Sequence, residues 1–234
     1  MPKRKEALTE KIRPYHIFGK AVEGKDIFEH EEDRSRFVFQ MYAANVGKPV
    51  INLYRKDIFQ VAQAILQGEE IPKGFITQEH EPLVHLFSFA FGKDRYHLGL
   101  VPALKEGIPL YMQKLNLGFA KYYNLKHKRQ GTLFEGRFRA APIINPSQLG
   151  DVVKYINIKK VMDLLGSQAL LEYPYSSFPD LFGTRISHLL SQESRGNLYK
   201  LLGEDFFGDQ EDYGDFIREF LPGGETIKRS LFFE

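Results

Sequence analysis

The fold of this chain is decided by residues 87 to 101, Phe-Ser-Phe-Ala-Phe-Gly-Lys-Asp-Arg-Tyr-His-Leu-Gly-Leu-Val. Apolar residues alternate with small or polar ones on both sides of Gly92-Lys93-Asp94, which is typical of two short strands joined by a tight turn. We therefore predict a central β-hairpin. Arg95, His97 and Gly99 share one face of its second strand, because side chains alternate with a period of two. That face is polar where a core would be apolar.

Short strands and amphipathic helices flank this hairpin on both sides. Strands are predicted over 14–18, 49–54 and 140–144, and helices over 31–46, 57–67, 109–129 and 149–165. A surface loop is expected over 69–81. The order strand, helix, hairpin, helix, strand, helix indicates an α+β fold, with an antiparallel sheet and helices packed on one of its faces.

The pattern weakens after Gly166, where only short helical stretches are predicted, over 186–190 and 213–220. We therefore expect a main domain over residues 1–182, with an insert over 47–83 to which we assign no role. Residues 183–234 are expected to form an acidic, mainly helical C-terminal extension.

Composition excludes several classes of protein. The chain has 234 residues and no cysteine, so disulfides and thiolate metal sites are ruled out. No run of about 18 apolar residues occurs, and the charged N-terminus is not followed by an apolar segment. We expect a soluble, cytoplasmic protein without a membrane partner.

Charge is distributed unevenly, although the net charge is only +2. Residues 93–140 contain ten Lys or Arg against three acids, whereas residues 201–226 contain eight acids against one Arg. A basic middle and an acidic tail favour an anionic partner for the first and a contact with basic groups for the second. Ordinary solvated faces are the alternative explanation.

Several short motifs, taken in order, resemble one family. They are Tyr15-His16-Ile17-Phe18, Tyr96-His97-Leu98, the stretch 112–124, Gly131-Thr132-Leu133-Phe134-Glu135-Gly136-Arg137-Phe138, Tyr155-Ile156-Asn157 and Tyr175-Ser176-Ser177-Phe178. Together they are similar to the REP-associated single-tyrosine transposases of the HUH endonuclease superfamily. The resemblance covers about residues 12–182. It implies a ferredoxin-like fold and a tyrosine that cuts single-stranded DNA near a hairpin through a phosphotyrosine intermediate.

The resemblance also implies a catalytic site, from which this chain departs. Tyr155 is the candidate nucleophile, and His97 stands at one family position for a ligand of Mg²⁺ or Mn²⁺. Arg95 and Lys159 stand where the family has two further metal ligands, and cations have no lone pair to give a metal. The divalent metal is therefore expected to bind weakly or not at all. Arg95 and Lys159 become candidate phosphate contacts instead.

Basic and aromatic residues interleave in the segment that the family uses near its hairpin substrate. Cations track phosphates, and aromatic rings stack on unpaired bases. The candidate DNA-binding residues are Lys114, Lys121, Lys126, Lys128, Arg129, Arg137, Arg139, Tyr122 and Phe134. The alternative is that the aromatic residues belong to the core and the lysines to a solvated helix face. His16 and His127 are interpreted as structural or surface residues.

Three functional hypotheses follow. The first is a transposase-like protein that binds hairpin or single-stranded DNA through a degraded metal site. The second is an active enzyme that nicks and rejoins single-stranded DNA with Tyr155. The third is a domesticated, non-catalytic interaction protein whose acidic tail, around residues 204–219, covers the basic surface or contacts a partner. The family often forms a homodimer, which this sequence leaves open.

Overall fold

The computed structural model describes residues 13–49, 57–161, 172–181 and 184–190. In chain order its elements are β1 (Tyr15–Lys20), η1 (Val22–Gly24), α2 (Glu31–Val46), β2 (Lys48–Pro49), α3 (Ile58–Gln67), β3 (Ile76–Thr77), β4 (Val84–Phe91), β5 (Arg95–Pro102), α4 (Gly107–Lys126), β6 (Arg139–Pro142), α5 (Pro146–Lys154), η2 (Tyr155–Lys159) and α7 (Phe178–Leu181). The predicted hairpin and the four main helices are present. No helix in these ranges is long and apolar enough to cross a membrane.

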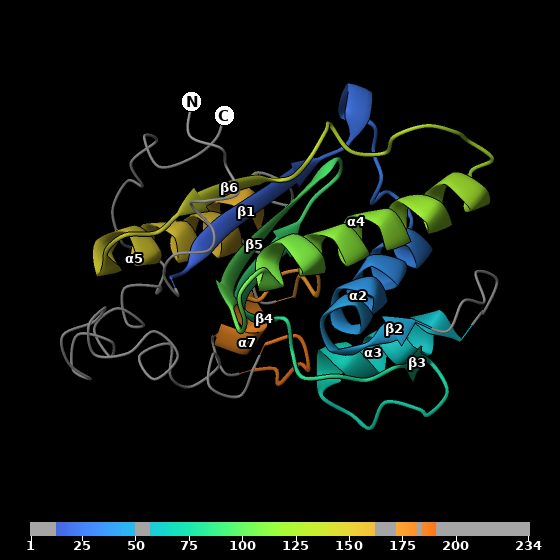
Figure 1. The fold of residues 1–234 in the computed structure, drawn as a ribbon, viewed down its shortest axis with the longest axis horizontal. Coiled ribbons are helices and arrows are strands. Elements are labelled where there is room, and N and C mark those ends of the chain that lie inside the picture. The colour runs from blue at the N-terminus through green and yellow to red at the C-terminus, as the bar shows by residue number, and fades with distance from the viewer. Residues whose placement is uncertain (1–12, 50–56, 162–171, 182–183, 191–234) are drawn as a thin grey trace.

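A four-stranded antiparallel sheet in the order β4-β5-β1-β6 forms the centre of the molecule. The predicted hairpin supplies β4 and β5, and β1 pairs with β5 from Tyr15 opposite Leu100 to Lys20 opposite Arg95. Figure 1 shows this twisted sheet with helices against it. The arrangement confirms the predicted α+β class and is consistent with a ferredoxin-like fold.

One face of the sheet packs on α2 and α4 through a cluster of aromatic rings. Period-2 alternation sends Tyr96, Leu98 and Leu100 of β5 to this face, where all three are fully buried. Phe37 of α2 packs its ring against those of Tyr96 at 5.2 Å and Phe119 of α4 at 5.0 Å between centroids. Aromatic pairs at this spacing add to the stabilisation that burial already gives.

The opposite face is covered by α5 and η2, so helices lie on both sides of the sheet. Asn145 caps α5 as expected, since its side-chain oxygen accepts the backbone N–H of Gln148 at 2.9 Å. The polar residues of β1 and β5, including His16 and His97, point to this face. The sequence pattern indicated the polarity of the face without showing that a helix covers it.

The predicted insert contributes β2, α3 and β3. α3 packs beside α2, and Gly68 ends it in the left-handed conformation with φ of 68°, as its position predicted. The expected loop over 69–81 includes the two residues of β3, which pair with β2. Most of the strand predicted over 49–54 lies outside the described residues.

The segment after α5 returns to the sheet beside β4. Ser177 donates its backbone N–H to the carbonyl of Phe89 at 2.7 Å, and a bridge joins Ser176 to Ala90. Residues 184–190 contain no helix, so the helix predicted over 186–190 is wrong. The backbone there follows the contacts of Arg185 and the bond from the His188 N–H to the carbonyl of Ile65 instead. The rest of the predicted acidic, helical extension, 191–234, lies outside the described residues.

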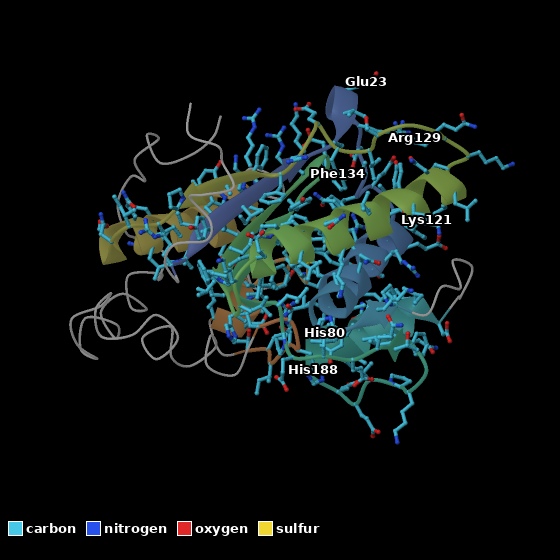
Figure 2. The ribbon with its side chains drawn as sticks, viewed as in Figure 1. Glu23, His80, Lys121, Arg129, Phe134 and His188 are labelled. Carbon is cyan, nitrogen blue, oxygen red and sulfur yellow. The ribbon has the colours of Figure 1, made fainter. Side chains whose placement is uncertain are left out.

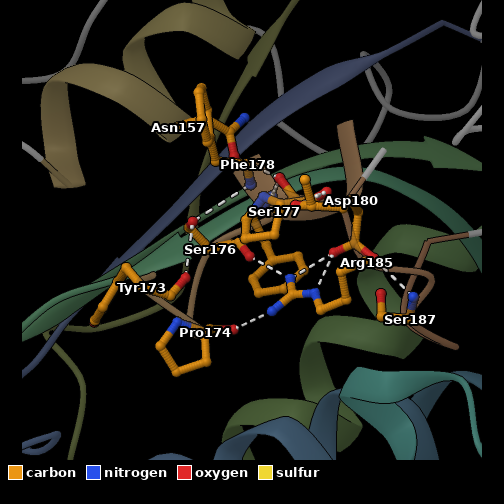
Figure 3. Close-up of polar contacts among 12 residues, drawn as sticks. Asn157, Tyr173, Pro174, Ser176, Ser177, Phe178, Asp180, Arg185 and Ser187 are labelled. Atoms are coloured by element: carbon orange, nitrogen blue, oxygen red, sulfur yellow. Dashed lines mark hydrogen bonds and ion pairs between the residues drawn. The ribbon is translucent and has the colours of Figure 1, made fainter. Parts of the chain in front are cut away.

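A buried ion pair between Arg185 and Asp180 holds this segment together (Figure 3). The Asp180 side chain is fully buried and that of Arg185 is 6% exposed. Arg185 donates to the Asp180 carboxylate through Nε at 3.0 Å and to the carbonyl of Pro174 through Nη1 at 2.7 Å. The second carboxylate oxygen accepts the backbone N–H of Ser187 at 2.7 Å. One guanidinium therefore closes the turn from residue 174 to residue 187.

Replacing Arg185 alone should destabilise the protein strongly. Arg185→Met leaves the Asp180 charge buried without its partner, which costs about 3 kcal/mol of unfolding free energy. Removing that charge as well, in Arg185→Met with Asp180→Asn, should recover part of the loss. Urea unfolding of the full chain measures both, with Arg137→Met, an exposed arginine, as a control that stays within about 0.5 kcal/mol. A double variant less stable than the single one would contradict the argument.

Candidate functional site

Two histidines from neighbouring strands meet on the sheet face below α5 and η2. His16 on β1 and His97 on β5 approach within 3.0 Å between Nε2 and Nδ1, and their rings stack at 5.3 Å between centroids. They are 1% and 3% exposed. One of these nitrogens donates a proton to the other, so the pair is a hydrogen bond between two neutral rings.

Burial keeps both rings neutral. It lowers the pKa of His16 to about 4, with a further contribution from the positive charge of Lys160. Burial also lowers the pKa of His97 well below its usual value, and His16, Lys160 and Arg95 add to the effect. Both histidines are therefore uncharged at neutral pH.

Tyr155 lies directly over this pair. Its ring meets those of His97 and His16 edge-on, at 5.5 Å and 5.8 Å between centroids. The structure therefore brings together two of the predicted site residues, Tyr155 and His97, which are 58 positions apart. The side chain of Tyr155 is 1% exposed, and its hydroxyl oxygen is buried.

The helix that carries Tyr155 changes its winding at this residue. Residues 155–159 form a π-helical turn, in which the N–H of Lys160 bonds to the carbonyl of Tyr155. A π turn places residue i+5 under residue i, where an α-helix would place residue i+4. Accordingly Lys160 holds its Nζ 4.7 Å from the centre of the Tyr155 ring. The resemblance instead named Lys159, four residues after Tyr155, whose side chain lies outside the described part.

Asn157 fixes the π turn against the sheet. It is fully buried and donates from Nδ2 to the hydroxyl of Ser88 on β4 at 2.8 Å and to the carbonyl of Val153 at 3.1 Å. Its oxygen accepts the hydroxyl of Ser177 at 2.6 Å. Ser177 belongs to the turn that Arg185 closes, so that ion pair also supports the helix carrying Tyr155 (Figure 3).

A cleft of about 350 Å³ opens beside the cluster, at the turn of the central hairpin. Cations line it at Lys93, Arg95 and Lys160, and His97 lies at its base. Arg95 is bound to the neighbouring Asp94 through Nε at 2.6 Å and Nη2 at 2.9 Å, and this pairing raises the pKa of Arg95. Arg95 is therefore a partly neutralised cation in the cleft wall.

The donors in this cluster do not suit the divalent metal that the resemblance implies. Mg²⁺ takes oxygen ligands and Mn²⁺ prefers them, but the nearest groups here are two imidazoles and the cations Lys160 and Arg95. His97 Nδ1 is already bonded to His16. Within the described ranges, no three His, Cys, Asp or Glu side chains gather in a way that could hold a metal ion.

The predicted DNA-binding residue Arg139 lies on the same sheet face, further toward its edge, and Arg137 precedes it just before β6. Arg139 on β6 stands opposite Phe18 on β1 and places its guanidinium 5.9 Å from that ring. Phe18 stands in turn opposite His97, with ring centroids 4.9 Å apart. A shallow groove joins Lys20, Arg137 and Arg139. Lys20 is paired with Glu135 at 3.0 Å, and Arg137 and Arg139 are the exposed cations of this groove.

The remaining predicted cations lie on α4 and in the loop after it (Figure 2). Lys121 and Lys128 are exposed. The other three have protein partners: Lys126 pairs with Glu32 and the buried Asp33, Lys114 donates to the carbonyl of Gly47, and Arg129 donates to Asn124. Half-buried His127 also contacts Asp33, at 3.2 Å, in agreement with a structural role.

Tyr122 and Phe134 do not offer rings for base stacking. Both are 7% exposed and belong to the core, where Phe134 packs edge-on against Tyr96 at 5.6 Å. Tyr122 donates its hydroxyl to Asp33 at 2.9 Å. Their burial favours the alternative that the sequence left open, in which these aromatic residues belong to the core between α4, α2 and the sheet.

Three members of the cluster were missed from the sequence. His16 was interpreted as structural or surface, although it lies one strand away from His97 on the same face. The alternation of β1 places it there, but the pairing of β1 with β5 was needed to see it. Lys160 was hidden by the π turn. Asn157 was quoted only as part of the motif that contains Tyr155.

Comparison with known proteins gives a single distant similarity. No protein-family model and no curated protein sequence matches the chain. Among solved structures, the chain is similar to a REP-associated tyrosine transposase bound to a REP hairpin, over 80% of this chain and 89% of that one. The sequence identity is 9% and the TM-score is 0.45. A similarity of this size does not transfer function between the two chains.

The neutral histidine pair predicts how stability changes with pH. The unfolded chain protonates histidine below a pH of about 6.5, whereas the fold holds His16 neutral down to about 4. Stabilisation by the neutral ring is therefore complete above pH 6.5 and is lost as the pH falls from 6.5 toward 4. Between pH 7 and pH 5, His16 should lower the free energy of unfolding by roughly 2 kcal/mol.

Urea unfolding at pH 7 and pH 5 measures this loss in the natural chain and in His16→Gln. Glutamine keeps a polar group beside His97 but does not titrate, so the variant should lose less free energy on acidification. An equal loss in both chains would contradict the assignment.

Proposed function

We propose that this protein binds single-stranded or hairpin DNA at the cleft beside the hairpin turn and at the exposed cations near β6, and that it holds the DNA backbone without cutting it. The observation that carries the proposal is the meeting of Tyr155 and His97 in a buried cluster beside a cleft lined with cations. The resemblance read from the sequence supplies the class of partner, and the geometry supports a grip on phosphate.

Burial of Tyr155 argues against attack on a phosphate. A nucleophilic hydroxyl must reach within bonding distance of phosphorus and lose its proton as it attacks. Tyr155 is 1% exposed, with its ring over two neutral imidazoles and under the ammonium of Lys160. The surrounding donors also do not suit the metal that would offset negative charge in the transition state. This combination favours binding over catalysis.

Contacts to phosphate would come from the cations at the hairpin turn, at the cleft and on β6. Lys93 and Arg139 are exposed, and Lys160 is half-buried at the cleft. Each such cation that neutralises a phosphate releases counterions, which makes binding depend on salt. Phosphate contacts fix position but carry no base sequence. The proposed mode is therefore recognition of the backbone.

Base stacking contributes less than the sequence suggested. With Tyr122 and Phe134 in the core, Phe138 is the partly exposed ring that lines the groove beside Arg137 and Arg139. One ring can stack on one base. We infer that affinity comes mainly from charge, and that discrimination between DNA sequences is weak.

An active DNA-nicking and rejoining enzyme is the second candidate. The observation that favours it is the pair of neutral imidazoles beside Tyr155, since a neutral histidine can accept the proton of an attacking hydroxyl. In this case DNA would have to draw the Tyr155 hydroxyl out to the cleft.

A covalent-adduct assay separates the two candidates. Labelled single-stranded DNA with a hairpin is incubated with the full chain or with Tyr155→Phe, with and without Mn²⁺, and followed on native and denaturing gels. We expect both proteins to shift the DNA on the native gel and neither to form an adduct. An adduct that requires Tyr155 would instead support the nicking enzyme, and failure of both proteins to bind would overturn both candidates.

Salt dependence locates the binding surface. Arg137→Gln with Arg139→Gln should weaken binding and make the slope of log K against log salt shallower by about 1.4, because each phosphate contact on a single strand contributes about 0.7. Lys73→Gln removes an exposed charge from the loop between α3 and β3 and should leave the slope unchanged. Fluorescence anisotropy over a salt series measures all three proteins. Equal slopes in all of them would place the DNA elsewhere.

A further inference from the structure

The outer side of α4 carries a stripe of exposed leucines with lysines between them. Leu110, Leu117 and Leu125 are 40%, 63% and 45% exposed. Lys114 and Lys121 fall between them, so the five residues repeat at helical spacing along one side. We call this set the α4 stripe. In Figure 1, α4 crosses the front of the molecule with α2 and the sheet behind it.

The composition of the α4 stripe defines what would cover it. Single exposed leucines are common on protein surfaces, but these three line up on one side of a helix and form an apolar stripe that the lysines interrupt. Two lysines within that strip favour a partner with apolar side chains and a negative charge. The matching occupant is therefore an amphipathic, acidic segment.

A second copy of this chain does not meet that requirement. If two α4 helices cross antiparallel at Leu117, Lys121 of one copy faces positions 113 and 114 of the other, which brings it close to Lys114. If they lie parallel, each lysine faces itself. Like charges set opposite one another oppose the pairing in both arrangements.

The C-terminal acidic segment, residues 204–221, has the required composition. It contains seven acids and one arginine. Tyr213, Phe216, Ile217, Phe220 and Leu221 recur at helical spacing, and Asp212, Asp215 and Glu219 fall together beside them on the same predicted helix. One side of the segment is apolar and its flank is acidic, which complements the α4 stripe.

We propose that residues 204–221 of the same chain dock on the α4 stripe. Phe216, Ile217 and Phe220 would cover Leu117 and its neighbours, and the acids would pair with Lys121, while Lys114 keeps its bonds to the carbonyl of Gly47 and to His80. The connection consists of the 13 residues between Leu190 and Glu204, which can span up to roughly 45 Å. Because the segment is tethered, it reaches the stripe at high effective concentration.

Photo-crosslinking in the full chain tests this contact. A benzoylphenylalanine replaces Leu117, and in a second protein it replaces Ile144, which is equally exposed at 62% but precedes α5. Irradiation of the first protein should give a cross-link to residues 204–221 within one chain, identified by mass spectrometry of the monomer band. The yield should exceed that from position 144 by about tenfold, because docking raises the local concentration of the segment.

A charge reversal makes the test specific. Lys121→Glu added to the position-117 probe should lower the yield severalfold, whereas Lys73→Glu, an exposed lysine outside the α4 stripe, should leave it unchanged. Equal yields from positions 117 and 144, a cross-link to α4 of a second chain, or a tail cross-link insensitive to Lys121→Glu would each overturn the proposal. None of these outcomes depends on whether the protein binds DNA.

Discussion

The structure depends on β5, because its alternate side chains enter the aromatic core on one face of the sheet and the buried polar cluster on the other. Tyr96, Leu98 and Leu100 point into the aromatic core against α2 and α4, and alternation then sends Arg95, His97 and Gly99 to the other side. A slip of one residue in the pairing of β5 with β1 would place His97 among the phenylalanines and Tyr96 under α5. Register, core and candidate site are therefore fixed by the same strand.

The second face is polar but buried, so its polar groups need hydrogen-bond partners within the protein. A buried polar group is costly unless it is hydrogen-bonded. His16 and His97 satisfy part of this requirement with each other, and Asn157 does so with Ser88 and Ser177. Ser177 is held by the turn that Arg185 closes onto Asp180. The cluster around Tyr155 is thus supported from the sheet below it and from the segment that follows.

Local patterns predicted the fold well. The alternation of residues 87–101 and the helical spacing of residues 57–67 each depend on neighbouring residues alone, and the hairpin and α3 appear at the expected places. The covering of the second face by α5 and η2 was not predicted, because period-2 alternation shows that a face is polar without showing what packs on it. Likewise the helix expected over 186–190 is replaced by an irregular turn, because the side chain of Arg185 and the bond from His188 to α3 fix its backbone.

The resemblance named two residues of the buried cluster, and the differences elsewhere have two physical reasons. Tyr155 and His97 were identified through a resemblance that names residue types at fixed positions, so their meeting required only the right topology. Lys160 was missed because a single π turn moves the facing position from i+4 to i+5. Tyr122 and Phe134 were assigned to DNA because an aromatic residue beside a lysine looks alike in a core and on a surface. Burial depends on contacts distant in sequence, which spacing does not contain.

The two proposals constrain each other through the lysines of α4. Lys114 and Lys121 were predicted to contact DNA, but a lysine paired with an acid of residues 204–221 is not available to a phosphate at the same time. The cations that stay open when the α4 stripe is covered are those beside the cleft and on β6, among them Lys93 and Arg139. DNA bound there would contact the hairpin turn and the exposed arginines near β6. Under these two proposals, the small net charge of +2 is the sum of an acidic tail and two basic surfaces. The tail would cover one of these surfaces, and the nucleic acid would bind the other.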